Sequence, residues 1–149
     1  MSLEHRLGTK TRLLRKILEA DLFDSKAILS RLHKDTDKPG CYIIWPRKRG
    51  GRPLYVGMAN HWLLGRLRNH IARGQTSFRN YVADQILKKG DVRKKSAIRR
   101  KQIYEDVNGW VKMNCRFQYL ILRRQDEAEL LEKFATAVLE PLLQYPARR

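Results

Sequence analysis

The chain has 149 residues, and 42% of them are hydrophobic, which is enough for a folded domain with its own core. Lys and Arg number 32 against 15 Asp and Glu, giving a formal net charge of +17. A polyanion is therefore the expected partner, because a strongly positive surface attracts and holds phosphates. The excess is greatest over residues 40–74, which include seven basic and no acidic side chains.

The sequence argues against a secreted or membrane-spanning protein. No stretch approaches ~18 consecutive apolar residues, and the N-terminus has no apolar signal core. We expect an intracellular protein, cytoplasmic or nucleoid-associated, with no membrane partner. Cys41 and Cys115 lack the CxxC spacing of the usual zinc sites. Both are expected to be reduced, although a disulfide is possible if their strands are adjacent.

The first part of the chain is predicted to be helical. Apolar residues fall on one face of a helix over residues 9–22, with Thr9 or Thr11 as its cap. A second, short helix is predicted to begin at the cap signal Asp24–Ser25. Pro39 then breaks the helical pattern, because proline disfavours helical geometry in the residue before it.

A strand hairpin is predicted next, from residues 42–45 and 54–56. The segment between them is rich in glycine and proline, which favours a turn and an antiparallel pair. Gly57 is expected to end the second strand, and a helix follows over residues 62–73.

The second half is expected to contain two helices, over residues 77–89 and 94–107, and then a strand. The run 111–122 partly alternates apolar and polar residues and is the longest strand signal, so we place it at the centre of the sheet. A last helix is predicted to start near Asp126 and to end or bend at Pro141.

Each candidate functional residue has an ordinary structural explanation when it is taken alone. Tyr42 and Tyr55 could be a packed cross-strand pair, and Arg66 and His70 a solvated helix face. Glu132 could be one exposed acid among several on an amphipathic helix. A short motif match by itself carries a high risk of being accidental.

The order and spacing of these residues change that judgement. Gly40-Cys41-Tyr42 is followed by Tyr55-Val56-Gly57, then by Arg66 and His70 at a spacing of four residues. The pattern resembles the GIY-YIG nuclease superfamily, whose helix after the second motif carries an Arg and then a His or Tyr. The resemblance covers roughly residues 39–73 and 112–146.

A late segment extends the resemblance. The family has a sequence like ALLLE and, nine residues later, P-x-x-N; here AELLE ends at Glu132, and Pro141 and Gln144 follow. Gln144 stands where the family has Asn, which keeps the amide but lengthens the side chain. Cys41 in place of Ile is a mild change, because both pack as apolar groups. The loop before Arg66 is about one residue longer than in common members.

The resemblance implies an α+β fold, with a small antiparallel sheet of about three strands flanked by helices. It implies a single GIY-YIG-like nuclease domain over residues 1–149. Residues 1–38 would be an N-terminal helical extension, and residues 74–111 a basic helical insertion before the last strand.

The resemblance also implies a metal-dependent endonuclease with Tyr42, Tyr55, Arg66, His70 and Glu132 as catalytic residues. Arg66 would bind phosphate, and Glu132 would hold Mg²⁺ or Mn²⁺, a hard cation that can be bound by one carboxylate together with waters and substrate oxygens. Tyr42 would act as a base or position the attacking water, for which nearby positive charge would have to lower its pKa. Tyr55 and His70 would orient water or contact phosphate, with Gln144 as a supporting amide.

Nucleic acid, and DNA rather than RNA, is the expected substrate, an inference by association with the family. We expect the insertion, with the N-terminal helices, to grip it. The basic residues expected to bind nucleic acid are Arg68 and Arg73 in the helix before the insertion, and Lys94, Lys95, Arg99 and Arg100 within it. The alternative is a non-catalytic nucleic-acid-binding protein that retains the GIY-YIG fold, a hypothesis to which Gln144 gives some weight.

Overall fold

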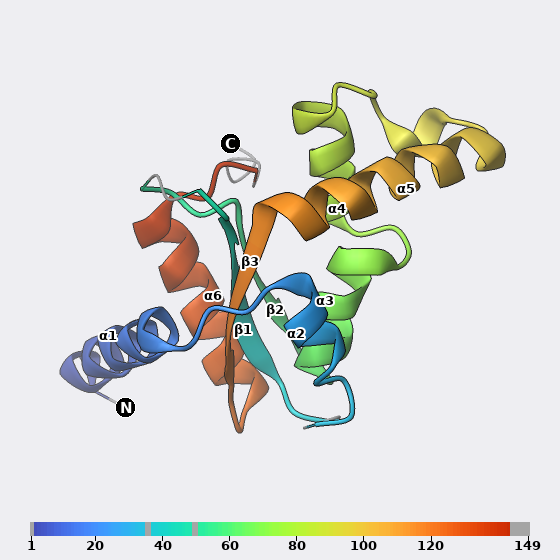
Figure 1. The fold of residues 1–149 in the computed structure, drawn as a ribbon. Coiled ribbons are helices and arrows are strands. Elements are labelled where there is room, and N and C mark those ends of the chain that lie inside the picture. The colour runs from blue at the N-terminus through green and yellow to red at the C-terminus, as the bar shows by residue number, and fades with distance from the viewer. Residues whose placement is uncertain (1, 35–36, 49–50, 144–149) are drawn as a thin grey trace.

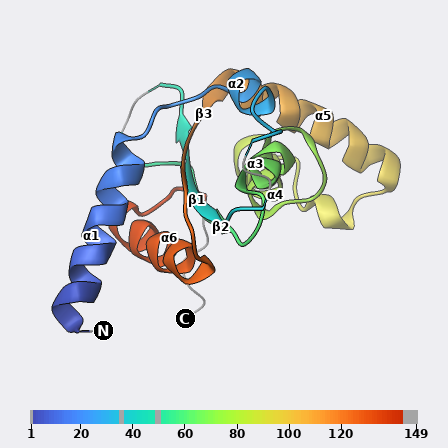
Figure 2. The same cartoon turned by 90° about the horizontal axis from the view of Figure 1, so that it is seen from below.

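The computed structural model describes residues 2–34, 37–48 and 51–143. Its centre is a three-stranded antiparallel sheet in the order β2-β1-β3, formed by β1 (Gly40–Pro46), β2 (Tyr55–Ala59) and β3 (Cys115–Ile121). Helices lie on both faces of this sheet (Figures 1 and 2). The predicted α+β class and the three antiparallel strands are therefore confirmed.

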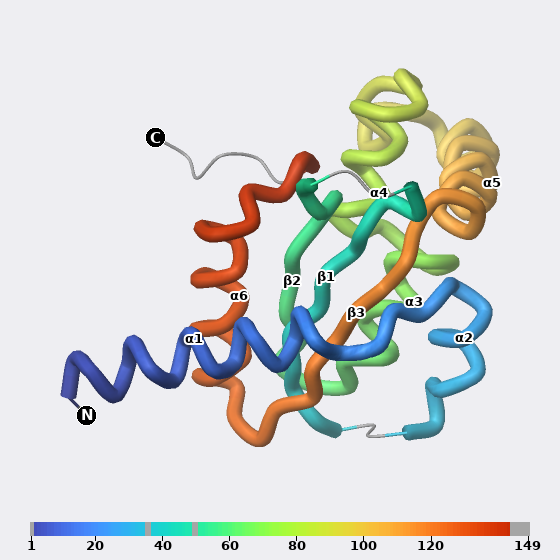
Figure 3. Tube along the Cα trace, turned by 60° about the vertical axis from the view of Figure 1, so that its left-hand side comes forward, coloured from blue at the N-terminus to red at the C-terminus, as the bar shows by residue number. Residues whose placement is uncertain are grey.

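Two layers of helix bury the sheet. α1 (Leu3–Glu19) and α6 (Gln125–Leu139) cover one face, and α1 contacts both α6 and β3 (Figure 3). The other face is covered by α2 (Ser25–Leu29), α3 (Leu63–Ala72), α4 (Ser77–Tyr81) and α5 (Ala97–Asn114). A π-helical turn (Val82–Ile86) and a 3₁₀ turn (Val92–Lys94) connect α4 to α5.

β1, rather than β3, is the central strand, so the prediction for the sheet centre is wrong. Side chains of β1 are buried on both faces: Tyr42 and Ile44 on the α3 side, Cys41 and Ile43 on the α6 side. Such a strand is apolar throughout and shows no alternation, so the length of an alternating pattern was a poor guide to which strand is central. β3 lies at an edge of the sheet, where Phe23 forms an isolated bridge with Phe117.

Residues 111–114 are also helical, not extended as predicted. Val111 continues the buried row of Ile103 and Val107 at a spacing of four residues, so it belongs to the core face of α5. Met113, on the other side of the helix, is 73% exposed. The alternating letters of this stretch therefore coincide with one turn of helix, and the strand begins at Cys115.

Other element boundaries differ from the predictions in ways that local chemistry explains. α1 begins at Leu3 because the hydroxyl of Ser2 accepts the backbone N–H of His5 at 3.2 Å. Gly57 lies inside β2 and does not end it. The helix predicted over 77–89 is α4 plus the π-helical turn, and the one predicted over 94–107 is displaced to the limits of α5.

The two cysteines are buried and free. The register places Cys41 opposite Leu120 and Cys115 opposite Pro46, so the adjacent strands do not bring them face to face. The expectation of reduced cysteines agrees with this arrangement. Among the described residues, no helix is long and apolar enough to cross a membrane.

Candidate active site

The two motif tyrosines point to the same face of the hairpin. Tyr42 lies opposite Gly57 in the register and Tyr55 lies opposite Ile44, which puts the tyrosine rings near each other with centroids 6.3 Å apart. The His70 ring from α3 completes the group, at 5.2 Å from the Tyr42 ring and 5.6 Å from the Tyr55 ring. The three rings are thus one cluster drawn from β1, β2 and α3.

Gly57 is required by this cluster. A Cβ atom placed there would lie 2.5 Å from Cζ of Tyr42 and still closer to its hydroxyl oxygen. Only a residue without a side chain leaves room for the phenol at this pair of the ladder. The glycine of the Tyr-x-Gly motif therefore has a packing cause: it makes the pocket for the hydroxyl of Tyr42.

A hydrogen bond of 2.5 Å joins the hydroxyl of Tyr42 to Nε2 of His70, and Nδ1 of His70 lies 2.9 Å from Oγ1 of Thr76. His70 is fully buried, and burial, followed by the charges of Arg66 and Arg79, lowers its pKa from 6.5 to about 3. His70 is therefore neutral near pH 7, and its two ring nitrogens have fixed protein partners.

The phenol of Tyr42 is also neutral. Its pKa is raised well above the ordinary value, mainly by burial and secondarily by Tyr55, while Arg66 acts in the opposite direction through its charge and as a hydrogen-bond donor. Positive surroundings were expected to lower this pKa. That expectation is wrong, because desolvation of a tyrosine that is 1% exposed outweighs one guanidinium.

Arg66 lies at the rim of the cluster. It is exposed, although it shares the expected helix face with the buried His70 one turn later. Arg66 lines an open pocket of about 570 Å³ together with Asn60, Arg68 and Asn69. The Arg68 guanidinium stacks on the ring of Trp62, 4.8 Å from its centroid, at the start of α3. Arg66 thus offers a permanently charged donor to an anion in this pocket, which Tyr42, Tyr55 and His70 do not line.

Glu132 lies on α6, outside the tyrosine cluster. α6 covers the face of the sheet opposite Tyr42 and packs along the edge strand β2. Burial is the main cause of the raised pKa of Cys41 and of Tyr55, and the half-buried carboxylate of Glu132 raises each pKa further. Its own pKa is raised, first by burial, then by Glu129, with Lys133 opposing.

The donor set at Glu132 fits a magnesium or manganese ion of the kind that retains several waters. No cluster of three or more His, Cys, Asp or Glu side chains suited to a metal exists within residues 2–34, 37–48 and 51–143. The neighbouring Lys133 pairs with Glu129 at 2.9 Å and leaves Glu132 outside that ion pair. One carboxylate is sufficient for such an ion, because waters and substrate oxygens complete its coordination.

The remaining predicted residues are placed as follows. Gln144 lies outside the described residues. Arg73 is exposed at the end of α3, next to the site. The other four basic residues lie around the N-terminal end of α5, which projects away from the sheet (Figure 1): Lys94, Lys95, Arg99 and Arg100. They extend the positive surface and do not join the tyrosine cluster.

Two buried polar residues near His70, Thr76 and Arg79, were not among the residues predicted from the sequence. Thr76 is 5% exposed and caps α4 by accepting the N–H of Arg79 at 3.2 Å. Arg79 is 2% exposed, donates from Nη1 to Asn108 and stacks on Tyr104, 4.7 Å from the ring centroid. The cap pattern Thr-Ser after a glycine is visible in the sequence, but the contact of the cap with His70 depends on tertiary structure.

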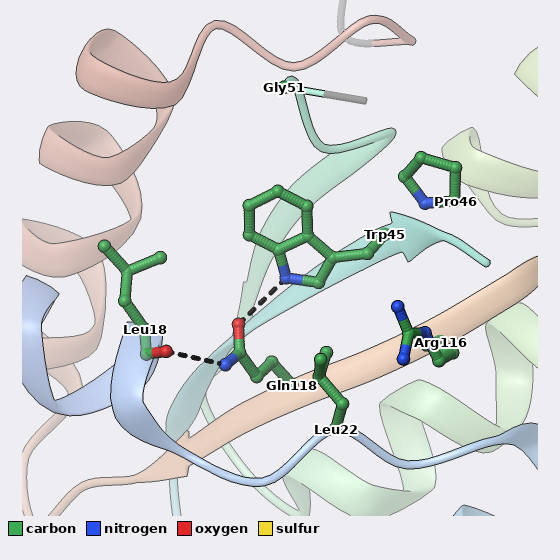
Figure 4. Close-up of a pocket in the computed structure, with 7 residues that line it drawn as sticks. All are labelled: Leu18, Leu22, Trp45, Pro46, Gly51, Arg116 and Gln118. Carbon is green, nitrogen blue, oxygen red and sulfur yellow. Dashed lines mark hydrogen bonds between the residues drawn. The ribbon is translucent and has the colours of Figure 1, made fainter. Parts of the chain in front are cut away.

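A separate pocket of about 310 Å³ lies at the α1 face of the sheet (Figure 4). Gln118 holds it together: its carbonyl oxygen accepts from Trp45 Nε1 at 2.8 Å, and its amide donates to the carbonyls of Leu18 and Ala20 at 3.0 and 2.8 Å. All the polar atoms of this side chain are therefore used to fasten the end of α1 to β1 and β3, a structural role.

Comparison with known proteins gives a likeness of fold. No protein-family model matches the sequence, and no curated protein sequence matches it. Among solved structures, the chain is similar to the GIY-YIG N-terminal endonuclease domain of UvrC from Thermotoga maritima. Two point mutants of that domain, each bound to its catalytic divalent cation, match with 17% and 16% identity and a TM-score of 0.46, over 82% of this chain and 99% of that one.

The same domain bound to magnesium, described as its catalytic divalent cation, matches with 17% identity and a TM-score of 0.39. That match covers 81% of this chain and 99% of the other. These structures carry the GIY-YIG fold that the sequence motifs of this chain resemble.

Proposed function

We propose that this protein is a divalent-metal-dependent endonuclease that hydrolyses phosphodiester bonds in DNA. The observation that carries the proposal is the cluster at β1, β2 and α3: a neutral tyrosine–histidine pair beside an exposed arginine, with Glu132 near the same strands. The net charge of +17 supports a polyanionic substrate. The choice of DNA follows the family resemblance alone.

Each residue has a separate task in this proposal. Arg66 binds the phosphate to be cut, because a planar guanidinium can donate two parallel hydrogen bonds to its oxygens. Tyr42 holds the attacking water through its hydroxyl oxygen, and His70 fixes the direction of that hydroxyl. Tyr55 borders the same space and orients the phosphate or the water. With both partners neutral, the pair acts by position rather than as a resident charged base.

Glu132 would hold Mg²⁺ or Mn²⁺. When bound, the ion supplies Lewis-acid stabilisation of the charge that develops on phosphoryl oxygens. The buried His70 and Thr76 then exclude water from behind the phenol of Tyr42, and Arg66 remains exposed at the open pocket. This division assigns phosphate binding and cation binding to two different residues, so their removal should have different effects.

The experiment compares two variants with the parent protein. Glu132→Gln keeps the size of the side chain and removes the charge a hard cation needs, so plasmid cleavage should fall by at least about a hundredfold while DNA binding survives or tightens. Arg66→Ala should lower both cleavage and affinity. The matched control is Glu129→Gln, which removes an exposed acid of the same helix and should cut at the parent rate.

A non-catalytic DNA-binding protein is the second candidate. The raised pKa of Tyr42 favours it, because the free protein holds almost none of the phenolate that a tyrosine base requires. A parent protein that binds DNA but never nicks supercoiled plasmid with Mg²⁺ or Mn²⁺ would establish this alternative. Parental cleavage by Glu132→Gln would instead remove Glu132 from the site.

A further inference from the structure

The hydrogen-bonded chain behind Tyr42 continues into a segment that the family resemblance does not cover. His70 bonds on one side to Tyr42 and on the other to Thr76, which belongs to residues 74–111. Thr76 is 5% exposed and His70 is fully buried, so water is largely excluded from their contact. The position of the His70 protons is therefore determined by the protein groups on either side.

The direction of each bond follows from the chemistry of the partners. Near pH 7 both Tyr42 and His70 are neutral, since burial disfavours the charged form of each and the cations Arg66 and Arg79 both face His70. A phenol is a stronger proton donor than a neutral imidazole N–H, and an imidazole nitrogen is the stronger acceptor. The hydroxyl of Tyr42 therefore donates to Nε2, and the single ring proton of neutral His70 lies on Nδ1.

Nδ1–H points to Thr76, whose oxygen accepts it. A hydroxyl oxygen has two acceptor lone pairs, and the other is taken by the backbone N–H of Arg79. We propose that Thr76 is a positioning residue of the active site: by accepting Nδ1–H it fixes the His70 tautomer that presents a bare Nε2 to Tyr42. The first turn after α3 thus supplies the outer support of the catalytic tyrosine.

The alternative tautomer would reverse both bonds. With the proton on Nε2, His70 would donate to Tyr42, and the phenol proton would lose its imidazole acceptor in a side chain that is 1% exposed. Loss of a buried acceptor for a strong donor is unfavourable. The role of Thr76 is consequently to make the imidazole available as the acceptor for Tyr42.

The first test measures the tautomer directly and needs no enzymatic activity. In the parent protein labelled with ¹⁵N-histidine, the His70 signals are assigned by their absence from His70→Gln. Nδ1 should have a protonated-type shift and Nε2 a bare-nitrogen shift near pH 7. Thr76→Val should move both nitrogens toward the values of an exchanging mixture, and Thr76→Ser should keep the parent pattern. A protonated Nε2 in the parent, or an unchanged tautomer in Thr76→Val, overturns the proposal.

The second test concerns cleavage, and this part rests on the proposed nuclease function. Thr76→Val should slow cleavage about tenfold or more, since small misplacements of a reacting group are costly, whereas Thr76→Ser should restore the parent rate. Loss of the helix cap is controlled by Ser96→Ala, because Ser96 caps α5 in the same way, accepting from Arg99 at 3.2 Å.

The two tests separate the two proposals. A parent that does not cut DNA but shows the Nδ1–H tautomer contradicts the nuclease function and leaves the assignment of Thr76 intact. A parent that cuts DNA with His70 protonated on Nε2 keeps the nuclease function and refutes Thr76 as the acceptor. Equal slowing by Thr76→Val and Ser96→Ala would reduce Thr76 to a helix cap and overturn the proposal.

Discussion

Acid should unfold this protein through His70 before its carboxylates contribute. The folded chain lowers the pKa of His70 from 6.5 to about 3, so below pH 6.5 the unfolded chain binds a proton that the folded chain does not. The free energy of unfolding then falls with decreasing pH, by up to ~1.4 kcal/mol per pH unit. Between pH 7 and pH 5 the loss from this one residue is about 2 kcal/mol, and it continues toward pH 3.

The assay is urea denaturation followed by far-UV circular dichroism across this pH range. His70→Gln removes the titrating group, so the difference in slope between parent and variant isolates His70. Other titrating groups are present in both proteins, so their contributions drop out of the difference. Two such groups are Glu132, whose pKa is raised, and Asp91, whose pKa is lowered by its bonds to Arg93. A second variant, His33→Gln, replaces an exposed histidine and serves as the control for the substitution itself. Equal slopes in the parent and in His70→Gln would refute the burial argument for a neutral His70.

Two further outcomes follow from the structure. Gly57→Ala should displace the phenol of Tyr42, destabilise the fold by about 1–3 kcal/mol in thermal unfolding and abolish cleavage; full activity would mean that the hydroxyl does not need this space. The second change neutralises four basic residues near the start of α5: Lys94, Lys95, Arg99 and Arg100. It should weaken DNA binding and lower the slope of log affinity against log salt concentration by about 0.9 for each phosphate that the protein no longer neutralises. An unchanged slope would show that this end of α5 faces away from DNA.

The sequence predicted the hairpin and the pairs of site residues that share a face. A period of two puts Tyr42 and Tyr55 on one face only once the register is known, and the eight-residue Gly- and Pro-rich segment between β1 and β2 leaves that register open. Helical spacing placed Arg66 and His70 on one side of α3. The relation between two residues four apart in a helix is local, so it does not depend on how the rest of the chain packs.

Residue spacing did not predict which side chains are buried. Spacing shows that Arg66 and His70 share a face, but not that the sheet covers one and leaves the other at a rim. A basic composition suggested a lowered pKa for Tyr42, whereas the depth of the side chain decides its sign. The sheet order and the contact of Thr76 with His70 also depend on which segments pack together, information that no single segment contains.

Burial also limits how Tyr42 can act. A free phenol with its ordinary pKa near ~10 is ionised in about one molecule per thousand at pH 7, and burial in this site reduces that fraction further. A mechanism that waits for the phenolate would therefore be slow in the free protein. A neutral phenol already held between His70 and the rim at Arg66 avoids that cost, because it positions the attacking water without ionising and without charging the buried His70. The acceptor geometry behind the tyrosine, rather than positive charge around it, is then the feature on which turnover depends.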